Sequence, residues 1–447
     1  MRNPLAAAGS VLRGYLALPK AVWTVTTGTF INMLGNFVGP FLALILTDRA
    51  GLSPDQAGLY VTLSSVVALG GILLGGKLVD AVGRKSVLLV FSGLAVAAYV
   101  ACAFALGNTP LLFGLLMAFT LCNAIAQPVL NTILMDVTPP EQRQRAFSLQ
   151  YVMLNAGFAV GPLLASFLYN GSLALMFVLD AATTLVSLLL VAAFVPESHP
   201  FRRPRGASVL ADSPAPAAGE PAASPPAPAH APGEAPVQGS LWSVLRVRPQ
   251  LLFFIATSVV FFLVFSQFTF GLSLQAKQTF GDAGPTVFGL MMTVNGLGVV
   301  LFSVPAGHAF RKRDPLVSIA AGSLLYTAGF GMMAVVRTVP LFLAATAVWT
   351  LGEVLVSPST NVYLASHTPI THRGRFNAIF PIVRRLGFAL GPALAGMYAA
   401  AHGITAVWIP TGILSLAAGG MTLFLLLWQR RSAEAGAPVS PPSDSVV

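Results

Sequence analysis

The feature that most constrains the fold of this chain is a series of apolar segments, each long enough to cross a lipid bilayer. A helix needs about 20 predominantly apolar residues to span the hydrocarbon core. Segments of this kind cover residues 21–47, 57–79, 86–107, 110–135, 146–169, 173–195, 250–275, 286–309, 316–336, 340–365, 376–400 and 404–428. Each must be helical, because unpaired backbone N–H and C=O groups are too costly in hydrocarbon. We therefore predict an all-α membrane protein with twelve transmembrane helices.

The composition excludes the soluble classes of protein. Of the 447 residues, 55% are hydrophobic and 9% are charged, whereas soluble domains carry about 25% charged residues. So few charges do not cover a water-facing surface of ordinary polarity, which argues against a soluble enzyme, a secreted protein and a fibrous protein. The sequence contains no metal-ligand spacing, and we expect no cofactor and no enzymatic activity.

Lysine and arginine residues are distributed unevenly between the two sides of the membrane. If the N-terminus is cytoplasmic, 20 of the 25 lie on the cytoplasmic side, whereas Arg49, Lys277 and Arg337 lie on the opposite side and Arg384 and Arg385 lie within a span. Cytoplasmic loops are enriched in Lys and Arg, so we expect both termini in the cytoplasm. This distribution accounts for the net charge of +10 without any nucleic acid. The composition resembles that of bacterial proteins, from which we expect a bacterial inner (plasma) membrane.

A Pro/Ala-rich stretch, residues 197–249, divides the spans into two sets of six. Such a composition favours extended, solvated chain, so we interpret it as a cytoplasmic linker. It joins an N-terminal six-helix bundle at 21–196 to a C-terminal six-helix bundle at 250–430. Residues 1–20 are predicted to be a cytoplasmic N-terminal tail, and residues 431–447 a disordered cytoplasmic tail.

The two halves repeat each other with a shift of 230 residues. The shift superposes a Gly-x-x-x-Gly-Pro motif on itself, with Gly157, Gly161 and Pro162 in the first half and Gly387, Gly391 and Pro392 in the second. Glycines four residues apart give a helix a smooth packing face, and proline kinks it locally. We therefore predict two pseudosymmetric bundles, each with a helix-packing motif at the same place.

A motif after the second span resembles the signature of the major facilitator superfamily, Gly-x-x-x-Asp-x-x-Gly-Arg-Lys/Arg. The matching residues are Gly76, Asp80, Gly83, Arg84 and Lys85. We expect Gly76 to allow close helix packing and Gly83 to allow a tight turn. The resemblance, which covers the chain outside the linker and tails, implies that the motif forms a cytoplasmic gate, with Asp136 as the acidic partner of Arg84. It also implies a secondary transporter that works by alternating access.

Polar side chains within the spans are the candidates for the transport site. Glu353 lies near the middle of its span, where an acid costs about 2.5–3.5 kcal/mol on insertion scales, so we expect it to be protonated, paired or facing an aqueous cavity. Two polar stripes related by the repeat are expected to face this cavity, namely Glu353, Ser357 and Asn361 in one half and Asn123, Gln127 and Asn131 in the other.

Other polar residues extend this candidate site. Because Arg384 and Arg385 lie about 100° apart on their helix, we expect one of them to face the cavity. We favour Arg385, as a partner of Glu353 or of an anionic substrate, whereas Arg384 has the alternative of snorkelling to the surface. Further candidates lie in the first, seventh and eighth spans: Asn32 and Asn36 on one face of the first, with Gln267 and Asn295 as lesser ones. Asp180 is expected near the outer interface, in contact with water.

The resemblance is closest to bacterial proton-coupled multidrug exporters, although the arginine that many of them carry in the fourth span is missing here. It implies proton-coupled export of small amphipathic or cationic compounds by a monomer in the lipid bilayer, with Glu353 as the proton and cation site. One alternative is uptake or facilitated transport of a polar metabolite such as a sugar, an amino acid or a short peptide, with Arg385 binding the substrate. A second alternative is a lipid-handling protein or a sensor on the same fold.

Overall fold

The computed structural model describes residues 14–196, 245–246, 248–310, 313–369 and 373–435. The tails and most of the linker expected from the sequence, at 1–13, 197–244 and 436–447, lie outside the described residues. Within the described ranges the chain is helical and contains no β-strand. Eleven of the described segments are long and apolar enough to cross a membrane, in keeping with an all-α membrane protein.

The first group of helices precedes the linker. Its elements are α2 (Lys20–Leu34), α3 (Val38–Leu44), the π-helical turn η1 (Ile45–Arg49), α4 (Pro54–Val82), α5 (Arg84–Phe104), α6 (Thr109–Asp136), the short η2 (Pro140–Gln142), α7 (Arg143–Gly171) and α8 (Leu173–Phe194). The first span expected from the sequence is thus broken, because residues 35–37 separate α2 from α3.

The second group follows the linker. Its elements are α10 (Pro249–Phe265), η4 (Ser266–Phe268), α11 (Phe270–Phe280), η5 (Gly281–Ala283), α12 (Gly284–Phe310), α13 (Pro315–Met332), α14 (Val339–His367), α15 (Arg373–His402), η7 (Ile404–Val407) and α16 (Trp408–Ala435). The seventh expected span is interrupted by η4, and α16 continues five residues beyond the expected boundary at 430.

Local sequence explains where several helices begin. Ser53 and Gln56 form a reciprocal capping box at the start of α4, which satisfies backbone N–H groups that lack a partner in the first turn. Asn108 and Asp314 accept hydrogen bonds from the first turns of α6 and α13 in the same way. These caps lie in short loops, so the helices of each group follow one another closely.

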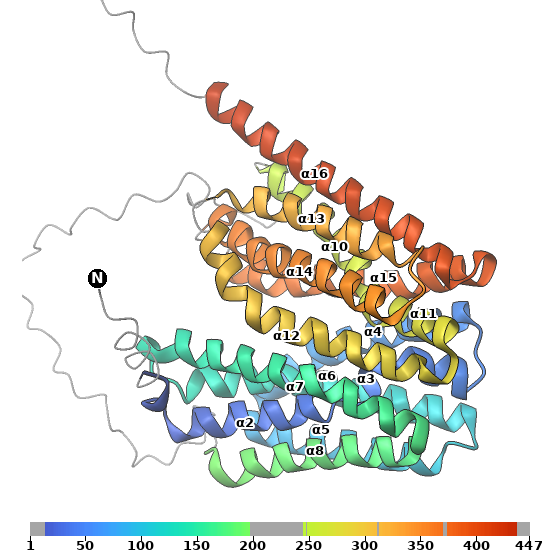
Figure 1. Ribbon diagram of the computed structural model, residues 1–447. Coiled ribbons are helices and arrows are strands. Elements are labelled where there is room, and N and C mark those ends of the chain that lie inside the picture. Colours follow the sequence, from blue (N-terminus) through green and yellow to red (C-terminus); the bar gives the residue numbers. More distant parts are fainter. Residues whose placement is uncertain (1–13, 197–244, 247, 311–312, 370–372, 436–447) are drawn as a thin grey trace, which may run out of the picture.

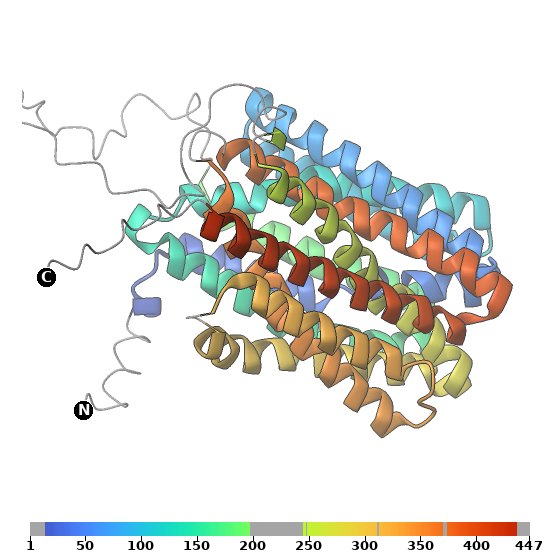
Figure 2. The same ribbon diagram turned by 90° about the horizontal axis from the view of Figure 1, so that it is seen from above.

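Among the described residues, three helix pairs make the main contacts between the two groups. These pairs are α4 with α15, α7 with α12, and α3 with α11. Figure 1 shows the helices lying side by side, with α2, α7 and α8 on one side of the molecule and α13 and α16 on the other, and Figure 2 shows the same bundle from above. Apart from the two interrupted segments, in which α3 continues α2 and α11 continues α10, successive long helices alternate in direction. Their ends therefore gather at two ends of the bundle, which we call the Asp48 end and the Asp136 end.

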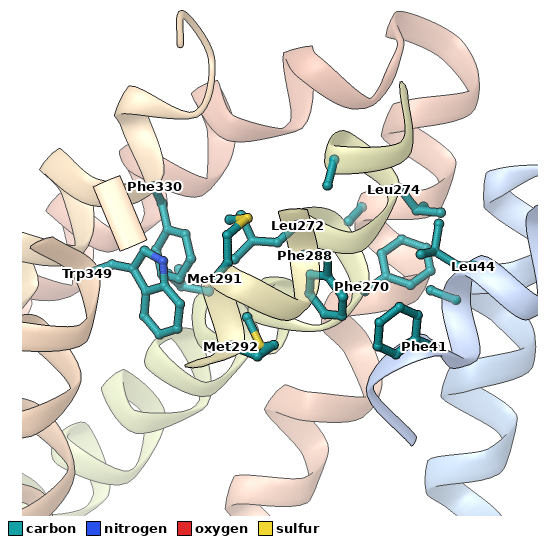
Figure 3. Close-up of a cluster of buried hydrophobic side chains, with 14 of the residues drawn as sticks. Phe41, Leu44, Phe270, Leu272, Leu274, Phe288, Met291, Met292, Phe330 and Trp349 are labelled. Carbon is teal, nitrogen blue, oxygen red and sulfur yellow. The ribbon is translucent and has the colours of Figure 1, made fainter. Parts of the chain in front are cut away.

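The two groups make close contact at the Asp48 end. A Cβ atom added at Gly58 of α4 would lie 2.2 Å from the carbonyl oxygen of Pro392 in α15, so the two backbones touch. The rings of Phe41 and Phe288 meet edge to face with their centroids 5.2 Å apart. Figure 3 shows these rings beside Leu44, Phe270 and Leu274 in one buried cluster. An apolar core therefore crosses from one group to the other at this end.

Candidate functional site

Glu353 of α14 is held by an amide from the neighbouring helix α12. The side-chain nitrogen of Asn295 donates hydrogen bonds to the Glu353 carboxyl at 2.8 Å and to the Thr350 hydroxyl at 3.1 Å. Arg384 of α15 is close enough to attract Glu353 electrostatically, although no ion pair within 4 Å involves Glu353 among the described residues. Asn295, a lesser candidate from the sequence, is thus the direct partner of the acid.

The two adjacent arginines have different partners. The Arg384 guanidinium lies 5.6 Å from the ring centroids of both Phe262 and Phe388, in the distance range of cation–π attraction. Arg385 donates a hydrogen bond of 3.2 Å to the side-chain oxygen of Gln127, which joins α15 to α6 in the other group. Of the two arginines, Arg384 is the one whose charge acts on Glu353, and the preference for Arg385 as the residue that faces the cavity stays a prediction.

The remaining residues of the two polar stripes are exposed side chains on α6 and α14: Asn123, Gln127 and Asn131 on the first helix, and Ser357 and Asn361 on the second. Of these five, Gln127 is joined to another candidate, Arg385. The structure thus assembles two polar contacts, one around Glu353 in the second group and one that crosses between the groups.

Two other candidates, Asn32 and Gln267, form side-chain hydrogen bonds within their own group, and a third, Asn36, lies at a break in the chain's first span. Asn32 donates to the hydroxyl of Thr184 in α8 at 2.9 Å, and Asn36 lies in the break between α2 and α3. Gln267 is buried, and its nitrogen donates to the hydroxyl of Ser266 at 3.2 Å. The expectation that Asn32 and Asn36 share one helix face is wrong, because the helix is interrupted between them.

Aromatic rings form a wall beside Arg384. Phe265 stacks on Phe268 with centroids 4.7 Å apart and meets Phe388 edge to face at 5.8 Å. Trp349, on the same helix as Glu353, lies 6.2 Å from Phe265. The polar contact around Glu353 is therefore bordered by aromatic rings, of which Trp349 is fully buried, whereas Phe265, Phe268 and Phe388 are partly exposed.

The motif between α4 and α5 forms a tight turn and an ion pair. Gly83 has φ +110°, a conformation that favours glycine, and Arg84 pairs with Asp136 at the end of α6. Lys85 donates to the carbonyl oxygens of Ala192 and Val195 at the end of α8. The side chain of Asp80 lies outside the described residues.

The close packing expected at Gly76 is found one residue earlier. A Cβ atom at Gly76 would meet nothing within 4 Å, whereas one at Gly75 would lie 2.5 Å from the carbonyl oxygen of Ile125 in α6. The rotation of α4 turns Gly75 toward α6 and Gly76 away from it.

Comparison with known proteins now identifies the family. A sequence model of the Major Facilitator Superfamily matches residues 25–284 and 274–444, which together cover most of the chain. The chain belongs to the major facilitator superfamily. Its relatives are transporters rather than enzymes, and the helical architecture is that of the superfamily.

Two relatives and one solved structure illustrate the likeness. A Na⁺, Li⁺, K⁺/H⁺ antiporter of Planococcus maritimus is 25% identical over 425 residues, which cover 89% of this chain and 93% of the relative. The multidrug resistance protein MdtH of Aeromonas salmonicida is 24% identical over 414 residues, with coverage of 91% and 94%. A peptide transporter POT, solved in complex with sulfate, shares the fold with a TM-score of 0.70 at 16% identity, covering 92% of this chain and 95% of its own.

The glycine motif of this superfamily member lies at equivalent helix contacts in the two groups. Cβ atoms at Gly157 and Gly161 would lie 2.7 Å from the carbonyl oxygen of Phe30 and 2.8 Å from that of Met33, so α7 touches the backbone of α2. Gly387 and Gly391 bring α15 equally close to α10. Both pairs support helix packing within a group.

Asp180 differs from its expected setting. It is 5% exposed, and one of its carboxyl oxygens accepts hydrogen bonds of 3.0 Å from the backbone N–H groups of both Phe37 and Val38. The sequence placed this residue near the interface in contact with water. Its true partners are backbone groups freed by the break in the first span, which composition and spacing do not reveal.

A second charged cluster, not predicted from the sequence, joins the two groups at the Asp48 end. The ammonium group of Lys277 lies 3.4 Å from Asp48 in the first group and 3.3 Å from Asp282 in its own. The Tyr169 hydroxyl donates to Asp48 at 2.8 Å. The only sequence signal was that Lys277 is one of the few basic residues expected away from the cytoplasm.

We expect the Asp48–Lys277 pair to contribute little to the free energy of unfolding. That contribution should nevertheless depend on the two side chains carrying opposite charges. Lys277→Glu should lower the free energy of unfolding in detergent by about 0.2–1 kcal/mol, the usual size of a partly exposed pair. Adding Asp48→Lys to that variant should recover part of the loss, because opposite charges then face each other again. Thermal unfolding of both variants measures the effect, and a double variant no more stable than Lys277→Glu would contradict it.

Proposed function

We propose that this protein is a secondary active transporter that exports small amphipathic or cationic compounds in exchange for protons. The observation that carries the proposal is the Glu353 carboxyl, held by Asn295 within a membrane span and bordered by aromatic rings. An acid in a membrane span is costly unless it has a partner or a function. The relatives named as an antiporter and as a multidrug resistance protein also support exchange and export.

Exchange follows from competition for one carboxyl group. With a proton bound, Glu353 is neutral and offers no attraction to a cation. Without the proton it is an anion that a cationic substrate neutralises, while the partly exposed rings of Phe265, Phe268 and Phe388 take up the apolar part of the substrate. Because proton and substrate exclude each other at this group, movement of one in one direction is linked to movement of the other in the opposite direction.

The proposed architecture has twelve crossings in two bundles of six. Eleven described segments are long and apolar enough to cross a membrane, and one of them, Pro249–Phe310, has 62 residues. As one helix it would be about 93 Å long, about three times the thickness of the hydrocarbon core. Gly281 ends α11 with φ +55°, and α12 packs back on α11. We infer that this segment crosses twice, which completes the six crossings of the second bundle.

The proposed orientation places the Asp136 end in the cytoplasm of a bacterial cell, with both termini and the linker on that side. The uneven distribution of Lys and Arg supports it. The contacts at Gly58, Phe41 and Lys277 then close the outer end, so we interpret the structure as a state that opens to the cytoplasm. The Arg84–Asp136 pair is proposed to act in the gate at the cytoplasmic end.

The test is proton flux in proteoliposomes that contain the full-length protein. Adding a lipophilic cation to one side should drive protons to that side, and liposomes without protein should show no such movement. Counterflow of a polar metabolite without proton movement would contradict the proposal and favour facilitated transport instead.

The alternative function, transport of a polar or anionic metabolite, is favoured by one observation. Arg385 is bonded to the neutral Gln127 rather than to an acid, so it retains a charge that an anion would neutralise.

Glutamine substitution of each arginine separates the two functions. Under the proposed function, Arg384→Gln should lower KM for a cationic substrate about tenfold, because a positive charge is removed beside Glu353; tenfold corresponds to about 1.4 kcal/mol. Arg385→Gln, the matched control, should change it much less. Loss of metabolite transport in Arg385→Gln, with Arg384→Gln unaffected, would support the alternative.

A further inference from the structure

The first transmembrane segment is broken, and a buried acid from another helix occupies the break. Residues 35–37 separate α2 from α3, so the N–H groups at the start of α3 have no carbonyl partner within the helix. A single oxygen of Asp180, in α8, accepts hydrogen bonds from the N–H groups of Phe37 and Val38 at 3.0 Å each. The carboxyl group thus stabilises the break itself.

α8 also holds the chain immediately before the break. Gly35 packs so tightly on Thr183 that an added Cβ atom would overlap the threonine side chain. Asn32 donates to the hydroxyl of Thr184 at 2.9 Å. The same stretch of α8 therefore contacts the first segment on both sides of the break. Thr183 and Thr184 contact the chain before the break, and Asp180 bonds to the start of α3 after it.

The part beyond the break, α3 and η1, contacts the second bundle. Phe41 meets Phe288, and Asp48 lies 3.4 Å from Lys277 of α11. Figure 3 shows Phe41 and Leu44 reaching the rings of Phe270 and Phe288. The direction in which α3 leaves the break therefore decides whether these contacts form.

The second half has a break at the equivalent place but no equivalent acid. The shift of 230 residues maps Asn36 onto Ser266, the first residue of η4, and maps Asp180 onto Pro410. In that half the ring of Trp408 packs against Gly271 just after the break. The carboxyl group is thus a feature of the first segment alone and not a consequence of the repeat.

We infer that Asp180 is a positioning residue for transport, which sets the direction of α3 and η1 and so determines how the outer end closes against α11. It touches neither Glu353 nor the aromatic wall, and it acts through the backbone of Phe37 and Val38. This role rests on the alternating access proposed above.

A cross-link tests the position of α3 and η1 without any transport. Thr47 and Gln278 line one pocket of about 390 Å³ at the Asp48 end, so a bifunctional thiol reagent long enough to span this pocket should join cysteines at these two positions when the end is closed. Asp180→Asn keeps an oxygen in place and should cross-link at a rate within about twofold of the parent. Asp180→Ser is too short to reach both N–H groups, and its rate per folded molecule should fall at least about fivefold, since unsatisfied buried groups are costly.

The control is Leu185→Ala, an exposed position of the same helix, which should leave the rate unchanged. Turnover in proteoliposomes should follow the cross-linking rate, with Asn close to wild type and Ser reduced. If Asp180→Ser lowers the folded yield but not the rate per folded molecule, Asp180 is merely structural and the inference is overturned. If Asp180→Asn abolishes transport with cross-linking intact, the residue carries a proton instead. The cross-linking result stays clear if the proposed substrate class is wrong, because the cross-link requires no substrate, whereas the result for Asp180→Asn requires a compound that the parent protein transports.

Discussion

Glu353→Gln should abolish proton movement driven by a cationic substrate. Glutamine has nearly the same shape and still offers an oxygen to the Asn295 amide, so the hydrogen bond at 2.8 Å can be kept and the protein should fold. It cannot bind and release a proton, however, and it offers no negative charge to a cation. We expect the affinity for the cation to fall at least about tenfold, which corresponds to about 1.4 kcal/mol of lost attraction.

The measurement is pH change inside proteoliposomes on addition of the cation, together with binding of the same cation in detergent. Glu141→Gln removes an exposed carboxyl group in the loop before α7 and should leave both quantities unchanged. Proton flux equal to wild type in Glu353→Gln would exclude Glu353 as the coupling site. Lost flux with unchanged cation binding would separate the proton site from the substrate site.

Gly58→Ala should force the two bundles apart at the Asp48 end. The added Cβ atom would lie 2.2 Å from the Pro392 carbonyl oxygen and 2.9 Å from its carbon, and neither backbone atom can turn aside as a flexible side chain can. Overpacking of this kind costs about 1–3 kcal/mol, which shifts an equilibrium between two conformations about 5- to 150-fold. The closed state of the Asp48 end should therefore lose population by about that factor.

The Thr47–Gln278 cysteine pair reports this shift as slower joining by the thiol cross-linker, and turnover should fall with it. Gly70→Ala is the matched control on the same helix, because a Cβ atom there meets nothing within 4 Å. A normal cross-linking rate in Gly58→Ala would mean that the contact between α4 and α15 adjusts without opening the end.

The helical, membrane-spanning character of the chain was predictable because a bilayer imposes its thickness on the sequence. Hydrocarbon requires about 20 apolar residues per crossing, and this requirement marks each span regardless of its neighbours. The family followed from the short motif ending in Gly83, Arg84 and Lys85, whose residue types serve local needs such as the positive φ of Gly83. Glu353 could also be selected from the sequence as a candidate site residue, because an acid in the middle of an apolar span is easily recognised.

The partners of these residues were decided by the rotation and spacing of helices, which one sequence does not determine. Arg384 and Arg385 are neighbours in the chain, yet one lies beside Glu353 and the other reaches Gln127 of the opposite group. Asp180 is held by backbone N–H groups 142 and 143 residues away.

The sequence by itself therefore determined which segments enter the membrane and which residues are costly there, because both depend on transfer from water to hydrocarbon. The tertiary structure alone decided which groups offset that cost, because hydrogen bonds and ion pairs act over a few ångströms between segments far apart in the chain.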